Sequence, residues 1–195
     1  MNDPLKDADD ASTPLTPEEQ QDLIPSYITL RRELNEAEQA NILEAEQWAL
    51  ARQRNALDLQ FLADLHKHMF GHVWRWAGKF RNTERNIGVA PAQIRPDLQQ
   101  LAADCGYWIK AGTYPPDEIA ARFHHRLTLI HPFPNGNGRH ARLATDSLLV
   151  SLGRPRFSWG RENLIDATQT RKTYVAALRA ADQHNLDPLL GFVRS

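Results

Sequence analysis

The chain has 195 residues, of which 42% are hydrophobic and 24% charged, with 12 prolines, 10 glycines and one cysteine. This composition fits a single domain with a sizeable core and excludes collagen, low-complexity and disulfide-stapled classes. No apolar run approaches the roughly 18 residues of a membrane-spanning helix, and Cys105 has no disulfide partner, so we expect a cytoplasmic protein without membrane contact.

The formal charge of −1 conceals two unlike segments. Residues 1–22 hold seven acidic side chains against Lys6 alone, and they contain three prolines and few large aliphatic residues. Such a segment cannot bury enough surface to offset the entropy lost on ordering. We therefore expect a disordered acidic tail over residues 1–22, followed by a net basic single domain over residues 23–195, a charge that suits a polyanionic ligand.

From Pro25 onward the hydrophobic residues recur at helical spacing. Asn35 and Glu38 have the spacing of a helix-starting capping box, and the helix would direct Ile42 and Ala45 inward. Similar stripes, bounded by glycine and proline, predict further helices over 57–69, 98–105, 119–130, 141–152 and 174–181, with a short one from Asp187. The predicted fold is mostly α.

Between Trp74 and Pro96 the helical spacing is lost. The residues from Gly78 to Pro91 include turn formers and short alternating pieces, which predict a β-hairpin or an irregular flap.

The segment from His131 to Arg142, His-Pro-Phe-Pro-Asn-Gly-Asn-Gly-Arg-His-Ala-Arg, carries the chemical information. Gly136 and Gly138 permit close backbone approach where a helix begins, and the exposed amides of a helix start bind phosphate. Arg139 and Arg142 lie on the same side of that helix and would reach a polyphosphate. Histidine can remove a proton from a hydroxyl near neutral pH.

This segment resembles the signature of the Fic (fido) family, His-x-Phe-x-(Asp/Glu)-Gly-Asn-Gly-(Arg/Lys)-x-x-Arg, with seven of its eight defined positions matched. The stretch Ala77-Gly-Lys-Phe-Arg81 and the flap after it also look like this family. The sequence of residues 33–42 resembles that of the Fic group called mobile mystery protein B.

The resemblance implies a Fic-type helical core and a nucleotidyltransferase that moves AMP from ATP to a Ser, Thr or Tyr hydroxyl of a target protein. His131 would be the general base, and Phe133 would anchor the loop in the core. The ATP phosphates would be bound by Gly136, Asn137, Gly138, Arg139 and Arg142.

Two positions depart from the family pattern. Asn135 stands where the family has a carboxylate that binds Mg²⁺, so we expect the metal cofactor to be held more weakly. The segment from Thr29 to Asn35 resembles the family's inhibitory helix, whose glutamate would be Glu33 facing Arg142, although Leu34 interrupts the pattern. The alternative is that Glu33 merely precedes a capped helix.

The flap would bind the target by strand pairing, through residues that include Thr83, Ile87, Gly88 and Val89. Expected partners are ATP, an unidentified target protein, the protein itself through automodification, and a helix-turn-helix protein of the kind associated with the mobile mystery B group.

Three other functions remain open from the sequence. One is a different nucleotide or phosphate transfer on the same fold, disfavoured by Gly138 and Arg139. Another is a metal hydrolase, suggested by the histidines but lacking a His-Glu-x-x-His string or a carboxylate cluster. The last is a catalytically weak nucleotide-binding or nucleic-acid-binding module, suggested by the basic body and by scattered pairs of arginines.

Overall fold

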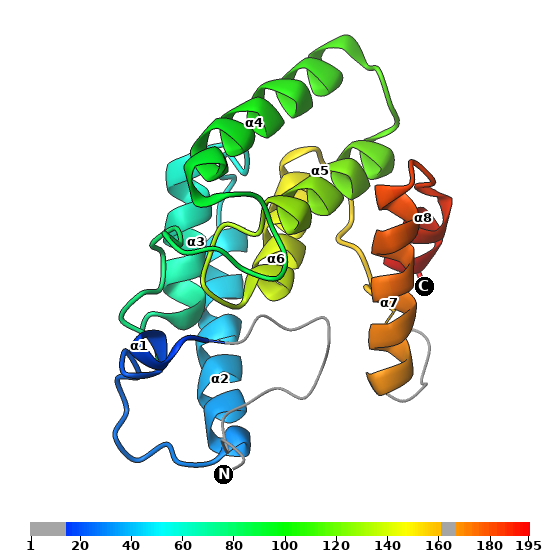
Figure 1. Ribbon diagram of the computed structural model, residues 1–195. Helices are drawn as coiled ribbons and strands as arrows, with labels where there is room; N and C mark the ends of the chain where they lie inside the picture. Colours follow the sequence, from blue (N-terminus) through cyan, green and yellow to red (C-terminus); the bar gives the residue numbers. More distant parts are fainter. Residues whose placement is uncertain (1–14, 161–166) are drawn as a thin grey trace.

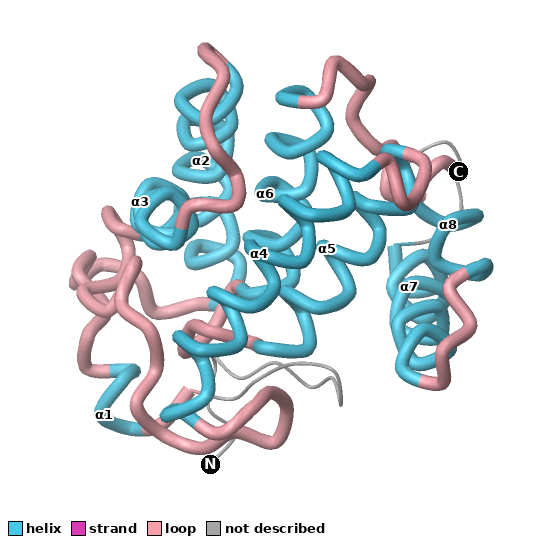
Figure 2. Tube along the Cα trace, turned by 90° about the horizontal axis from the view of Figure 1, so that it is seen from above, coloured by secondary structure: helices cyan, strands magenta, loops and turns pink. Residues whose placement is uncertain are grey.

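The computed structural model describes residues 15–160 and 167–195. Within these ranges it is built from helices and loops, and the only β contact is an isolated bridge between Leu23 and Trp74 (Figure 2). The helices are α1 (Pro17–Gln20), α2 (Arg31–Leu50), α3 (Leu59–Phe70), the 3₁₀ turn η1 (Pro91–Gln93), α4 (Ile94–Ala111), α5 (Pro116–Ile130), α6 (Asn137–Ser151), α7 (Ala167–Asp182) and α8 (Asp187–Val193). The predicted mostly α fold is confirmed.

Helix α6 lies at the centre of the molecule (Figure 1). It packs against α5 on one side and against α2 and α3 on the other, while α4 covers α5 and the α7–α8 pair meets the far end of α5. Ala141, Ala144 and Leu148 of α6 are fully or almost fully buried, as their spacing predicts. The loop from residue 131 to 136 joins α5 to α6, so the packing of these two helices fixes both of its ends.

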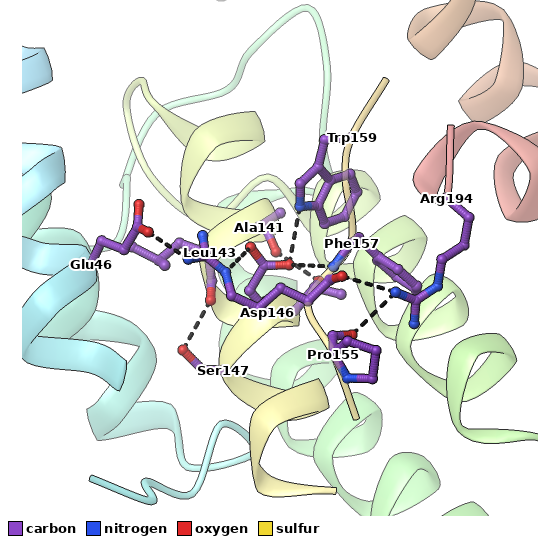
Figure 3. Close-up of polar contacts among 11 residues, drawn as sticks. Glu46, Ala141, Leu143, Asp146, Ser147, Pro155, Phe157, Trp159 and Arg194 are labelled. Atoms are coloured by element: carbon purple, nitrogen blue, oxygen red, sulfur yellow. Dashed lines mark hydrogen bonds and ion pairs between the residues drawn. The ribbon is translucent and has the colours of Figure 1, made fainter. Parts of the chain in front are cut away.

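The C-terminal half of α6 is tied to its neighbours by a polar cluster (Figure 3). The buried carboxylate of Asp146 accepts hydrogen bonds from Arg156 Nε at 3.1 Å and Trp159 Nε1 at 3.0 Å. Arg156 also pairs with Glu46 of α2, and Arg194 donates to the Arg156 carbonyl at 2.8 Å. These contacts hold the C-terminal segment against the C-terminal half of α6, away from the loop of residues 131–136.

The predicted acidic tail differs from the structure in its last part. Residues 1–14 lie outside the described residues, but residues 17–20 form α1. The Thr16 hydroxyl and the Glu19 carboxylate form a capping box, Glu19 pairs with Arg85, and the Glu19 carbonyl accepts from Trp76 Nε1 at 3.3 Å. Capping and contacts with the loop after α3 supply the order that composition alone did not predict.

The start of α2 also differs from the prediction. The helix begins at Arg31, and Glu33 closes its N-terminus by accepting from the amides of Thr29 at 2.9 Å and Leu30 at 3.0 Å. Asn35 and Glu38 therefore lie inside the helix and form no capping box. The buried face of α2 consists of Leu34, Glu38, Asn41, Ala45 and Ala49, so the helix directs two polar side chains inward.

The segment from 78 to 90 contains no strand, so a β-hairpin was the wrong alternative and the irregular flap is what the structure shows. Its backbone bonds to the neighbouring loop rather than to itself: Arg81 N donates to the Pro132 carbonyl at 2.9 Å and Val89 N to the Ile130 carbonyl at 3.4 Å. No described helix is both long and apolar enough to cross a membrane.

Candidate active site

His131 occupies a strained turn at the end of α5. It caps the helix in the left-handed conformation, with φ 54° and ψ 59°, and its backbone amide donates to the Leu127 carbonyl at 3.2 Å. A β-carbon makes this conformation unfavourable, so the surrounding contacts must hold it. The turn lies beside the flap, since a β-carbon on Gly88 would lie 2.7 Å from His131 Cβ.

The ring of His131 is held in the protonation state that a general base needs. Burial lowers the pKa of His131 to about 4, against a contact with the Thr128 carbonyl that raises it, and the cations of Arg81 and Arg85 lower it further. Nδ1 lies 3.3 Å from that carbonyl, which accepts only from a protonated nitrogen. The neutral ring therefore carries its proton on Nδ1 and its lone pair on Nε2, which can accept a proton at neutral pH.

Arg81, which the sequence singled out only through the Ala77–Arg81 stretch, fastens the flap to this turn. Its buried guanidinium donates to the carbonyls of His131 at 2.7 Å and Thr83 at 2.9 Å, and it also contacts the Val89 carbonyl. Gly88 has φ 107°, and a β-carbon there would lie 2.7 Å from both the Arg81 guanidinium and His131 Cβ. Of the predicted target-docking residues, Thr83, Gly88 and Val89 are thus brought beside the His131 turn, and Ile87 lies half-buried in the same loop.

The loop between His131 and α6 is braced from within. Phe133 is fully buried, as predicted, and its ring stacks on His66 with centroids 3.7 Å apart. The side chain of Asn137 spans the turn: its Oδ1 accepts from Phe133 N at 2.9 Å and its Nδ2 donates to the Phe133 carbonyl at 2.8 Å. The Asn137 side chain is therefore a brace, which leaves the Asn137 backbone as the group that can meet a phosphate.

His66 of α3 supports the same loop from below, a role that the sequence analysis missed. Gly78 N donates to His66 Nδ1 at 2.9 Å, so Nε2 carries the proton and donates to the Asn135 carbonyl at 3.0 Å. Burial lowers the pKa of His66 well below its ordinary value, which keeps the ring neutral and this single tautomer in place. The sequence feature that could have indicated this role is the position of His66 among the apolar residues on the buried face of α3.

The N-terminus of α6 has the geometry of an anion cradle. Gly136 begins the helix with φ 77°, and the first intrahelical bond of this helix runs from His140 N to the Gly136 carbonyl at 2.9 Å. The amides of the first turn therefore have no acceptor within the helix. A β-carbon on Gly136 would meet the Phe70 ring at 2.6 Å, whereas one on Gly138 would meet nothing within 4 Å, so open space lies beside this turn.

The two predicted phosphate-binding arginines project from α6 and are held differently. Arg139 donates from Nη1 to Glu38 Oε2 at 2.6 Å and lies 4.8 Å over the Phe70 ring. Arg142, one turn on, lies 5.7 Å over the Tyr174 ring of α7. Both guanidiniums are partly exposed, and their charges favour an anion at the start of α6.

The contacts of Asn135 and Glu33 differ from the roles that the family resemblance implies for them. Asn135 Oδ1 accepts from Gly136 N at 2.6 Å, so the amide oxygen points at its own loop. Glu33 is engaged in capping α2. The acid that pairs with an arginine of α6 is instead Glu38, and the sequence analysis did not identify its position on the buried face of α2. The described residues contain no group of three His, Cys, Asp or Glu side chains that could hold a metal, and the buried histidines have protein partners instead.

Comparison with known proteins bears on the family of this chain. Residues 56–149 match the model of the Fic/DOC family. The protein adenylyltransferase fic-1 of Caenorhabditis briggsae is 31% identical over 152 residues, which cover 74% of this chain and 28% of that relative. The chain thus spans less than a third of the length of this curated relative.

Solved structures share the fold. Fic-1 from Caenorhabditis elegans superposes with a TM-score of 0.63 at 27% identity, covering 90% of this chain and 51% of that one. The N-terminal Fic domain of a cell filamentation protein from Bartonella quintana, solved with bound ADP, superposes with a TM-score of 0.68 at 18% identity and covers 87% of this chain and 86% of that one. At that lower identity the second likeness speaks for the fold alone.

Proposed function

Because residues 56–149 match the Fic/DOC family model, we propose that the chain contains a Fic/DOC family domain and is a protein adenylyltransferase, which transfers AMP from ATP to a hydroxyl of a target protein. The observation that carries the proposal is that one short loop has a neutral His131 at its start and the open first turn of α6 at its end. One group can take a proton, and the other can hold the phosphates that surround the atom under attack.

In the proposed reaction the target hydroxyl oxygen attacks the α-phosphorus while its proton passes to Nε2 of His131. The bond between the α-phosphorus and the oxygen leading to the β-phosphate breaks, and pyrophosphate leaves. The amides of Asn137 and Gly138 stabilise negative charge on the phosphates, and the Gly136 amide would join them on leaving Asn135 Oδ1. Arg139 and Arg142 neutralise the β- and γ-phosphates. The flap beside His131 would present the target segment through its backbone.

Mg²⁺ fits this site only as an ion held mainly by the nucleotide. The Asn135 amide oxygen is the one protein ligand that we assign to it, and Mg²⁺ commonly keeps waters and substrate phosphates as its other ligands. Bound there, the ion would neutralise phosphate charge.

We further propose a cytoplasmic location, modification of the protein itself as well as a separate target, and membership of the mobile mystery B group with its helix-turn-helix partner.

Incubation with ATP labelled at either the α- or the γ-phosphate tests the reaction. We expect the α-label to become attached to protein in the wild type and in the exposed-site control His72→Gln, and to be lost in His131→Ala. Transfer of the γ-label would indicate phosphorylation, and an absence of both labels would contradict a transferase.

Inhibition by Glu33 is a separate proposal. In this structure its carboxylate bonds to the Thr29 and Leu30 amides, so inhibition would require it to leave the helix cap. Automodification that is faster in Glu33→Gly than in the wild type is the expected result, and an unaltered rate would leave Glu33 as a capping residue only.

A further inference from the structure

We propose that Glu38 of α2 is a positioning residue for the nucleotide site, which fixes the guanidinium of Arg139 in the orientation that binds the β-phosphate. This inference rests on the proposed function. It assigns to α2 a supporting role at a different arginine from the one that Glu33 was expected to face.

The carboxylate of Glu38 is itself fixed. The residue as a whole is 4% exposed, and its Oε1 accepts from Trp74 Nε1 at 2.7 Å. The Trp74 ring is buried and stacks on Trp76 with centroids 5.1 Å apart, so the donor cannot easily move. Helix α2 packs on both α3 and α6 (Figure 1). The carboxylate is thereby held against Arg139 in the first turn of α6.

The other oxygen of Glu38 meets Arg139. Oε2 accepts from Arg139 Nη1 at 2.6 Å, while the guanidinium lies over the Phe70 ring. Phe70 is 1% exposed and also sits against Gly136, so the ring that supports the arginine also supports the loop. A long side chain that would otherwise sample many rotamers is held by a carboxylate and by an aromatic face.

The pair leaves Arg139 able to bind an anion. Within residues 15–160 and 167–195, Nη1 donates to Glu38, whereas Nε and Nη2 have no protein acceptor. The Arg139 side chain is 32% exposed against 5% for Glu38, so the arginine faces outward from a buried anchor. A guanidinium has five N–H donors in a fixed plane, and fixing one edge orients the others. Glu38 therefore preorganises the arginine for phosphate instead of competing for it.

Equilibrium binding of ADP and AMP to the full-length protein tests the inference, with no dependence on turnover. The variant Glu38→Gln keeps an acceptor for Trp74 and removes the charge that holds Arg139, and Glu36→Gln on the exposed face of α2 is the matched control. We expect Glu38→Gln to weaken ADP binding about tenfold, since small misplacements of binding groups have effects of this size or larger. Binding of AMP, which has no β-phosphate, should not change.

The outcomes separate a positioning role from the alternatives. Unchanged or tighter ADP binding in Glu38→Gln overturns the inference, because the glutamate would then be neutral or inhibitory. Equal losses for ADP and AMP also overturn it and indicate a structural role. A wild type that binds neither nucleotide refutes the proposed function together with this inference.

A second variant decides the case in which Glu38→Gln does not fold. Glu38→Asp keeps the charge but withdraws the carboxylate by one methylene, so it cannot reach both Trp74 and Arg139 at their present positions. A selective loss of ADP affinity in this variant supports the inference, and full ADP affinity overturns it.

Discussion

At the scale of single residues, the environment of His131 sets the pH at which the site can work. An ordinary histidine is half protonated near pH 6.5, whereas burial lowers the pKa of His131 to about 4. We therefore expect the His131 ring resonances in an NMR titration to stay constant between about pH 8 and about pH 5.5. A midpoint near the ordinary value would show that the ring is solvated.

Asn135 sets a second expectation at this scale. The variant Asn135→Asp keeps an oxygen that can accept from Gly136 N and adds a negative charge that attracts Mg²⁺. We expect the Mg²⁺ concentration that half-saturates AMP transfer to fall several-fold, as measured by Mg²⁺ titration at constant ATP. An unchanged Mg²⁺ dependence would remove position 135 from the metal site.

At the scale of elements, the two glycines at the start of α6 serve different purposes. Gly136 has a left-handed φ and no room for a β-carbon, so Gly136→Ala should lower the free energy of unfolding by at least about 1 kcal/mol. Gly138 is helical with open space beside it, so Gly138→Ala should leave stability unchanged or raise it by up to about 1 kcal/mol.

Nucleotide binding distinguishes the second glycine's role. Because the added methyl of Gly138→Ala would enter the space assigned to the phosphates, ADP affinity should fall although the protein is no less stable. Urea unfolding and ADP titration of both variants check the pair. Full ADP affinity in Gly138→Ala would place the phosphates elsewhere.

The same scale shows what a sequence can predict. Helical spacing located α3 to α8, and the His131–Arg142 segment indicated the loop, because both depend on residues that are near one another in the chain. The contacts of Glu38 with Arg139 and of His66 with the Asn135 carbonyl join residues 101 and 69 positions apart, and no local pattern encodes them. The flap was ambiguous for a related reason: its amides bond to the Pro132 and Ile130 carbonyls, which only tertiary packing brings there.

At the scale of the whole molecule, the buried neutral histidines should make the protein unstable in acid. His66, His124 and His140 are fully buried, and burial lowers their pKa values, to about 3 for His124, to about 4 for His140 and well below the ordinary value for His66. A depressed pKa means that the unfolded chain binds each proton first. The associated stability is therefore present above about pH 6.5 and is lost as the pH falls from there toward the folded values.

Near pH 5 the unfolded state would bind about two more protons than the folded state at His124 and His140 together, so these two sites alone should lower the free energy of unfolding by about 3 kcal/mol per pH unit. Total stabilities of about 5–15 kcal/mol would be lost within a few pH units. Urea unfolding across this range measures the slope, which should decrease by about 1.4 kcal/mol per pH unit in His140→Gln. The slope, rather than the absolute stability, is decisive, because His140→Gln also loses packing, and an unchanged slope in this variant would mean that His140 is already charged in the folded protein.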